Sequence, residues 1–398
     1  MIEHSRRDDK RWLVLGVFVA SSAINYLDRQ TLATVGPLIR DEFHLTTEQF
    51  GWVIGVFSVA YAVCAPLAGL LIDRAGLTAI ASIAVAVWSW AGIATGFTRG
   101  ITGLIGCRTA LGIAESAGIP AAGKAIDLYL RPGERALGNA MNQAGVSVGL
   151  IIAPPLAVWM TTHYGWRSAF GVTGLFGLAW IPLWNLTARL SPPQAPKPAP
   201  MSGNAALLAD YRLWVFVIAN ALTMFGYSLW TNWSTFYFVG VHHLALPLAS
   251  RYVLGVFLFA TAGGFISGWL SAKLIARGME PAHARLRICA ICAALSLITA
   301  TIPLATTPLF AAAAIAISFF AVSAMSVNVY SLPLDTFGHK HAAFSIAALV
   351  ASYGAMQLLV SPIIGRMIDA HQWNRPIWFA TLTPTLACLI LWTARPRA

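Results

Sequence analysis

Long apolar runs that recur along the whole chain are the feature that most constrains its fold. Charged or proline-rich breaks divide the sequence into twelve such runs, at 12–39, 47–72, 78–98, 101–129, 135–161, 166–188, 212–239, 249–275, 286–306, 308–334, 341–366 and 376–394. A helix needs about 20 apolar residues to cross the hydrocarbon core of a bilayer. We therefore expect an all-α membrane protein with twelve transmembrane helices.

The charge content excludes a soluble globular protein of this length. Only 10% of the 398 residues are charged, whereas a soluble domain is about 25% charged. The segments between the apolar runs are too short for a sizeable water-soluble domain. The first run is also far longer than the apolar region of a signal peptide, so we expect it to remain as the first transmembrane helix.

Basic residues predict the orientation of the chain. If the N-terminus is inside and the runs alternate, most of the 26 Lys and Arg residues fall on the inner side. The outer side then carries Arg40, Arg99, Arg167, Arg251, Arg366 and Arg375. The positive-inside rule places both termini in the cytoplasm, and this distribution explains most of the +11 net charge without a nucleic-acid partner.

A proline-rich segment divides the chain into two halves of six runs. Residues 191–200 hold five prolines, a composition that favours extended polyproline II structure and a stiff linker. We expect an N-terminal six-helix bundle at 1–188, a cytoplasmic linker at 189–211 and a C-terminal six-helix bundle at 212–398. Two such halves, related by a weak internal repeat, are typical of one large class of secondary transporters.

Five ionisable side chains lie within the runs, and charge at this depth is costly and a functional candidate by default: Asp28, Arg29, Arg108, Glu115 and Lys124. Asp28 and Arg29 share one face of the first helix with Asn25. On the fourth helix, Arg108 and Glu115 share a face and are separated by about 10 Å along the helix axis. Two salt bridges that only hold the first and fourth helices together are the structural alternative. Buried ion pairs rarely repay their desolvation, so we favour a functional use.

The two acids experience opposed effects that suit a proton-binding role. Burial favours the neutral carboxyl group, and a neighbouring arginine favours the ionised one. An ionised acid competes for the arginine, and a protonated acid frees it for a substrate anion, so proton and anion binding favour each other. We hypothesise that Arg29 contacts the substrate, that Asp28 first accepts the proton and that Glu115 gates the coupling.

Uncharged polar residues recur at helical spacing in several runs. We select Tyr26, Tyr61, Gln143 and Gln357 as candidate substrate-binding residues, because a polyhydroxylated anion needs hydrogen-bonding groups. Hydrogen bonds between helices are the alternative. For Lys124 we expect snorkelling or a structural contact, with a substrate role as the alternative.

Small residues predict where helices approach closely. Gly145 and Gly149 are four apart, a spacing that allows close packing between helices. The same pair, followed by Pro154-Pro155, could instead mark a bend in the fifth helix.

Motifs of other function classes are missing from the sequence. There is no Gly-x-x-x-x-Gly-Lys-Ser/Thr phosphate-binding loop. The five cysteines lie inside apolar runs, which suits small core residues better than metal or redox chemistry. We therefore expect no enzyme, no catalytic residues and no metal.

Several motifs carry a resemblance to a known family. Gly69-Leu-Leu-Ile-Asp73-Arg74-Ala-Gly76 resembles the loop motif between helices two and three of the major facilitator superfamily, although Leu77 and Thr78 stand where further basic residues are usual. Similarity to the anion:cation symporter branch rests on Asn25-Tyr26-Leu27-Asp28-Arg29, Arg108-Thr-Ala-Leu-Gly112-Ile-Ala-Glu115, Pro120-Ala-Ala-Gly-Lys124, Gly165-Trp166-Arg167 and Leu332-Pro333-Leu-Asp335. Within that branch the chain most resembles proton-coupled hexuronate and aldonate transporters.

The resemblance implies a fold, a function and roles for individual residues. It implies the major facilitator fold and uptake of a small organic anion with protons, by alternating access, through a monomer in a bacterial inner membrane. Its implied residues are the proton sites Asp28 and Glu115, the substrate-carboxylate contacts Arg29 and Arg108, and the gating motif Gly69, Asp73, Arg74 and Gly76. H⁺ would be the coupling ion, with no other cofactor. The alternatives are a symporter of aromatic or short monocarboxylates, sodium coupling, or a membrane sensor that binds such anions without moving them.

Overall fold

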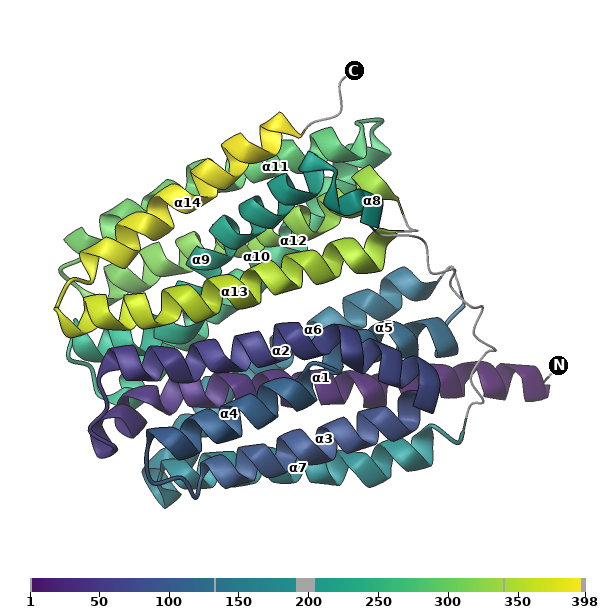
Figure 1. The fold of residues 1–398 in the computed structure, drawn as a ribbon, viewed down its shortest axis with the longest axis horizontal. Helices are drawn as coiled ribbons and strands as arrows, with labels where there is room; N and C mark the ends of the chain where they lie inside the picture. Colours follow the sequence, from purple (N-terminus) through teal and green to yellow (C-terminus); the bar gives the residue numbers. More distant parts are fainter. Residues whose placement is uncertain (1, 132–133, 191–204, 339–340, 395–398) are drawn as a thin grey trace. The chain divides into compact units, whose positions relative to one another are not determined.

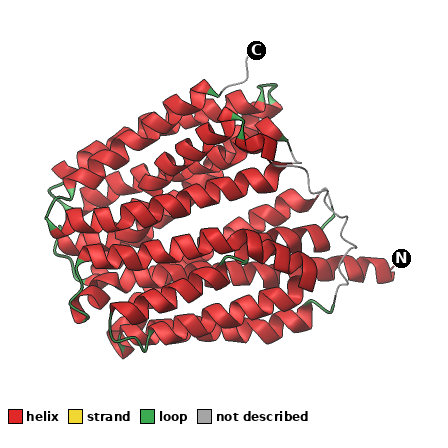
Figure 2. Cartoon of the chain, in the orientation of Figure 1, coloured by secondary structure: helices red, strands yellow, loops and turns green. Residues whose placement is uncertain are grey.

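The computed structural model describes residues 2–131, 134–190, 205–338 and 341–394, and in these ranges it is helical, without strands (Figures 1 and 2). The first half contains α1 (Ile2–Glu42), α2 (Thr47–Ala75), α3 (Leu77–Thr95), α4 (Ile101–Glu115), α5 (Gly118–Tyr129), α6 (Arg135–Tyr164) and α7 (Trp166–Thr187). The second contains α8 (Ala205–Leu208), α9 (Tyr211–Gly240), α10 (Leu246–Ala276), α11 (Pro281–Ser296), the 3₁₀ helix η2 (Leu297–Leu304), α12 (Pro308–Phe337), α13 (Ala342–Asp369) and α14 (Asn374–Thr393).

The prediction of twelve transmembrane helices is confirmed within the described residues. Ten helical segments are long and apolar enough to cross a membrane, α11 and η2 together forming one of them. The run at 12–39 lies inside the longer α1, and the run at 101–129 is formed by α4 and α5. The first contains Asp28 and Arg29, which lower its hydropathy, and α4 and α5 are each too short to cross a membrane alone.

The fourth crossing covers the expected residues 101–129 but consists of two helices and not one. The helix stops at Glu115 and resumes at Gly118, with a turn at Ser116 and Ala117. Proline has no backbone N–H, so Pro120 cannot donate to the carbonyl of Ser116 four residues earlier. The chain therefore loses a helical hydrogen bond immediately after Glu115.

Contacts divide the chain into two compact units, of which the first comprises Met1–Phe43 and Val56–Pro200 and the second His44–Gly55 and Met201–Ala398. The first part of α2 therefore groups with the second unit. Most of the expected linker at 189–211, including its prolines, lies outside the described residues.

Hydrogen bonds explain why the start of α2 belongs to the second unit. The Asp369 carboxylate at the end of α13 accepts the backbone N–H groups of Thr47 and Glu48, at 2.8 and 3.0 Å. These are N–H groups that a helix cannot satisfy within itself. A Cβ atom at Gly51 would lie 2.4 Å from the carbonyl oxygen of Ser361, so glycine permits this close contact with α13.

Aromatic residues fill the core of the first unit. Trp180 and Trp184 stack on α7 with ring centroids 5.5 Å apart, and Phe18 of α1 packs edge-on against both. The Trp180 indole N–H donates to the carbonyl oxygen of Val17 at 2.6 Å. This packing fixes α1, which carries part of the candidate site, against α7.

Cysteines contribute to the core of the second unit. Cys289, Cys292 and Cys388 are buried in one apolar cluster of α11, α12 and α14 residues. All five cysteines are free. The interpretation of the Cys289–Cys292 pair as small core residues agrees with this environment.

Close packing of α6 on α1 explains the glycines at 145 and 149. A Cβ atom at Gly149 would lie 2.1 Å from the carbonyl oxygen of Ala23, and one at Gly145 would lie 2.5 Å from a methyl group of Val19. The helix α6 continues through both positions and through Pro154-Pro155. The two glycines therefore serve packing between helices in this structure.

We predict that Gly149→Ala lowers the thermal stability of the detergent-solubilised protein. Overpacking costs about 1–3 kcal/mol, because the new methyl group must displace the α1 backbone. Gly92→Ala is the matched control, since a Cβ atom at Gly92 meets no atom within 4 Å. Equal thermal unfolding midpoints for the two variants would contradict this packing.

Candidate functional site

One ion pair connects the charged residues of α1 and α4 inside the first unit. Arg29 Nε of α1 donates to Glu115 Oε2 of α4 at 2.5 Å. The Glu115 side chain is fully buried, whereas 22% of the Arg29 side chain is exposed. The carboxylate is therefore shielded from solvent, whereas the Arg29 side chain is in part accessible.

Aromatic rings surround the same guanidinium. Its Cζ atom lies 5.1 Å from the ring centroid of Tyr26, 4.8 Å from that of Phe57 and 4.6 Å from that of Tyr61. A cation within about 6 Å of an aromatic face is attracted to it. These rings stabilise the Arg29 guanidinium without neutralising its charge.

The structure brings two of the predicted polar residues to Arg29 and adds one that sequence reasoning missed. Tyr26 and Tyr61 were selected as candidates, but Phe57 was not. Phe57 lies one helical turn before Tyr61 on α2, so the two rings share a face. The four-residue spacing between Phe57 and Tyr61 is the sequence signal that indicates a shared position, although the same spacing is equally common in apolar cores.

The position of Glu115 at the end of a helix makes its charge more costly. Glu115 is the last residue of α4, where the helix dipole is negative and disfavours a carboxylate. Its Oε1 atom is buried and accepts no hydrogen bond from the part of the chain that the structure describes. The pair with Arg29 is therefore the main compensation for this charge.

Asp28 is buried without a hydrogen-bond donor in place. The residue is 3% exposed, and neither carboxylate oxygen has a hydrogen-bond partner among the described residues. The hydroxyl of Thr173 on α7 lies close to the carboxylate, but it donates instead to the carbonyl oxygen of Phe170 at 3.3 Å. A buried polar group without a partner is costly, so this carboxyl group suits a role in which it gains a proton or a donor.

Arg108 completes the group of four charges. It is 4% exposed and forms no ion pair with a described residue, although it lies within electrostatic range of Asp28, Arg29 and Glu115. Close helix contact brings it there, since a Cβ atom at Gly112 would lie 2.5 Å from the carbonyl oxygen of Phe57. The purely structural interpretation expects two salt bridges between the first and fourth helices. Among the described residues, only Arg29–Glu115 is formed between them.

The two glutamine candidates are not brought to this group by any described contact. Gln143 is exposed on α6. Gln357 belongs to α13 in the second unit, where it is 2% exposed and its Oε1 atom has no hydrogen-bond partner. Their substrate-binding roles stay predictions.

Lys124 pairs with the predicted gating motif rather than with the buried charges. Its Nζ atom lies 2.7 Å from Asp73 Oδ1, connecting α5 to the end of α2. This is the structural contact that the sequence suggested. Gly76 has φ +87°, a backbone conformation that favours glycine between α2 and α3.

The other residues of this motif lie at the same end of α2. A Cβ atom at Gly69 would lie 3.8 Å from Pro120 Cβ, and the Arg74 side chain is exposed. Gating by this motif stays a prediction. Among the described residues, no group of three or more His, Cys, Asp or Glu side chains is placed to bind a metal ion.

The comparisons with known proteins show similarity to transporters over nearly the whole chain. The family model described as Major Facilitator Superfamily matches residues 18–353. The chain is 24% identical to a hexuronate transporter of Escherichia coli (strain K12), covering 96% of this chain and 93% of that protein. It is 26% identical to a probable sulfoacetate transporter of Cupriavidus necator, covering 92% and 89%.

A solved structure shares the fold. A bacterial homologue of the human lysosomal transporter Spinster, in an inward-facing and occupied conformation, matches with a TM-score of 0.81. The match covers 96% of each chain at 18% sequence identity, which supports similarity of fold alone.

We predict that Glu115→Ala and Lys124→Ala differ strongly in their effect on thermal stability. Removing one partner of a buried ion pair costs about 3–5 kcal/mol, and Glu115→Ala leaves Arg29 without its carboxylate. Loss of an exposed pair costs about 0–1 kcal/mol, which is expected for Lys124→Ala. Thermal unfolding in detergent measures both, and a larger loss for Lys124→Ala would contradict the assignment.

Proposed function

Because the chain belongs to the Major Facilitator Superfamily, we propose that it takes up an organic anion together with protons, most specifically a sugar acid such as a hexuronate or an aldonate. The chain is a transporter and not an enzyme. The observation that carries the proposal is the partly exposed Arg29 side chain, whose guanidinium pairs with one buried carboxylate beside an aromatic ring.

The substrate carboxylate takes the place of Glu115 at Arg29. A guanidinium carries five N–H donors in a planar fork that matches a carboxylate, and the pair with Glu115 uses its Nε atom. The exposed part of Arg29 gives the substrate a point of first contact. Arg108, buried nearby and in no ion pair with a described residue, adds a second positive charge that attracts the anion.

Protonation of Glu115 releases Arg29 for the substrate. A neutral carboxyl group attracts the guanidinium far less than a carboxylate, and the ionised form already carries a cost at the end of α4. Proton binding therefore increases the affinity for the anion, and anion binding increases the affinity for the proton by the same factor. This reciprocity is the basis of symport.

Asp28 is the proposed first proton acceptor. Its two oxygens are buried and have no hydrogen-bond partner among the described residues, so a proton removes a charge that is costly in an apolar environment. The neighbouring Thr173 hydroxyl, whose bond to Phe170 is long at 3.3 Å, can rotate toward either form of the carboxyl group. Asp28 can thus hold a proton before Glu115 receives it.

A sugar acid fits the polar groups better than a short anion does. The Tyr26 and Tyr61 hydroxyl groups belong to rings that contact Arg29, and they supply donors and acceptors beside the carboxylate-binding position. Gln143 and Gln357 are proposed to bind further hydroxyl groups. The 24% identical hexuronate transporter of Escherichia coli agrees with this substrate class. The Cupriavidus relative favours a second candidate, a short sulfonated carboxylate.

The proposed transport cycle is alternating access in a bacterial inner membrane. The protein acts as a monomer with both termini in the cytoplasm, because this orientation places most basic residues inside. The two six-helix halves alternate in exposing the site to each side. The Asp73–Lys124 pair and Arg74 lie at the inner end of the first unit in this orientation, which is the end where the gating motif is proposed to act.

We predict that Glu115→Gln separates exchange from accumulation. The neutral amide imitates the protonated acid, so the variant should still exchange labelled substrate across proteoliposome membranes. With one coupled proton, a pH difference of about one unit supports about tenfold accumulation in the wild type, and the variant should show none. Glu42→Gln is the matched control, because Glu42 pairs with Arg167 at the end of α1, away from the buried charges. Accumulation by Glu115→Gln equal to the wild type would disprove the coupling role.

The substrate class is tested by counterflow in proteoliposomes. We expect labelled glucuronate or galactonate to exchange, and sulfoacetate, lactate and benzoate to exchange poorly. Sulfoacetate exchange alone would favour the second candidate. Tight binding without flux would indicate a sensor, and flux that follows a sodium gradient but ignores pH would refute proton coupling.

Arg29→Lys should reduce exchange of every substrate, because lysine cannot form the planar two-point contact.

A further inference from the structure

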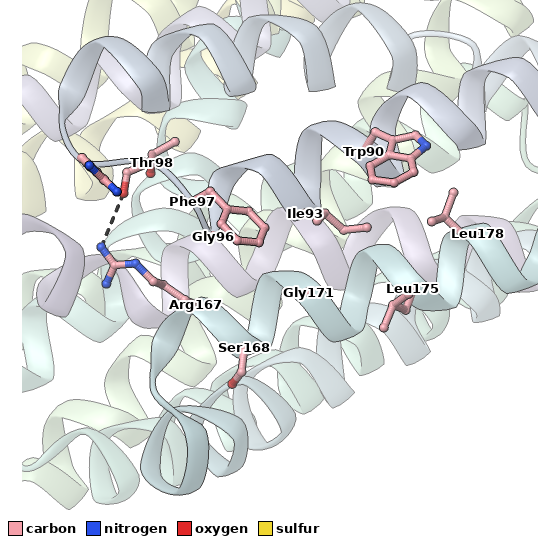
Figure 3. A pocket seen from close by; sticks show the side chains of 11 residues that line it. Trp90, Ile93, Gly96, Phe97, Thr98, Arg167, Ser168, Gly171, Leu175 and Leu178 are labelled. Carbon is pink, nitrogen blue, oxygen red and sulfur yellow. Dashed lines mark hydrogen bonds between the residues drawn. The ribbon is translucent and has the colours of Figure 1, made fainter.

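A groove separate from the buried charges lies between α3 and α7 in the first unit. Its volume is about 630 Å³, within the range of ligand-binding pockets. Figure 3 shows that Trp90 and Leu178 lie at one end and that Thr98 and Arg167 lie at the other. The side chains between these ends are mainly apolar, including Ile93, Phe97 and Leu175.

The length of the groove matches one leaflet of a bilayer. Between Arg167 and Leu178 the helix α7 rises about 16 Å, at 1.5 Å per residue. This is about half the 30 Å hydrocarbon thickness of a membrane. Trp90, Phe97 and Leu175 are all more than half exposed, so the apolar lining faces the surroundings of the helices and not the interior of the unit.

Positive charge is concentrated at one end of this apolar groove. Arg99 is exposed there and forms no ion pair or hydrogen bond with any residue that the structure describes. Arg167 is partly neutralised, since its Nη1 atom lies 2.7 Å from Glu42 Oε1 and its Nη2 atom donates to the carbonyl oxygen of Thr98 at 3.4 Å. Glu42 also accepts the indole N–H of Trp166 at 2.5 Å. The charge of Arg99 remains uncompensated.

We propose that this groove binds an anionic phospholipid, with the phosphate at Arg99 and Arg167 and one acyl chain along α3 and α7. An apolar groove as long as one leaflet, ending in an unpaired guanidinium, complements the charge and length of such a lipid. The proposed orientation of the chain makes this the outer leaflet. The site contains none of the residues assigned to transport, so it does not depend on the proposed substrate.

Native mass spectrometry of the full-length protein in detergent tests this site. The probes are phosphatidylglycerol and phosphatidylcholine with identical acyl chains, added at equal concentrations. We expect the wild type to retain more phosphatidylglycerol. Arg99→Ala should reduce its retention about fivefold, since one basic residue near a lipid surface contributes about 1 kcal/mol. Arg99→Lys should keep most of the preference, because it keeps the charge.

A second variant tests the apolar part of the groove. A Cβ atom at Gly171 meets no atom within 4 Å, so Gly171→Leu fills the groove without a backbone clash and should reduce retention of both lipids. Matched controls are Arg251→Ala, an exposed outer arginine of α10, and Gly255→Leu, where a Cβ atom also meets open space. Both controls should bind lipid as the wild type does.

Three results would overturn the proposal. Equal retention of the two lipids by the wild type would show that the groove does not select charge. Unchanged phosphatidylglycerol retention in Arg99→Ala would remove the headgroup site. An equal loss in Arg251→Ala would indicate attraction by outer arginines in general. Size-exclusion profiles that match the wild type confirm that each variant is folded.

Discussion

The ion pair between Arg29 and Glu115 determines how the first unit must be built. A guanidinium in an apolar interior needs a nearby negative charge, and this carboxylate comes from another helix. The helices α1, α2 and α4 must therefore meet closely, which Gly112 permits by allowing contact with the Phe57 backbone. The aromatic rings around Arg29 then add attraction without removing its charge.

Charges at the ends of the helices have a different physical role. Lys124 pairs with Asp73, Arg285 with Asp335 and Glu42 with Arg167, and each pair is at least partly exposed. Exposed pairs contribute little stability, but they orient the ends of neighbouring helices. The buried group differs because Asp28 and Arg108 form no ion pair with a described residue, and on this difference the proposed binding of a proton and an anion rests.

The sequence predicted much of this site because buried charge is rare and stands out. Arg29, Arg108, Asp28 and Glu115 stand out on that ground, and the other three lie within electrostatic range of Arg108. Phe57 and Thr173 were missed because a ring or a hydroxyl in an apolar run is ordinary. Their relevance depends on which residue of another helix lies beside them.

Hydropathy, helical periodicity and motif spacing determined the twelve crossings, the fold class and the helices that carry charge, because these properties depend on residues close together in the chain. Only the tertiary structure decided that Arg29, and not Arg108, forms the ion pair with Glu115. It also decided that Lys124 pairs with Asp73 and that the fourth crossing is interrupted after Glu115. Choice of partner depends on distances between helices far apart in sequence. Glycine contacts, proline breaks and aromatic packing set these distances together, and no single segment determines them.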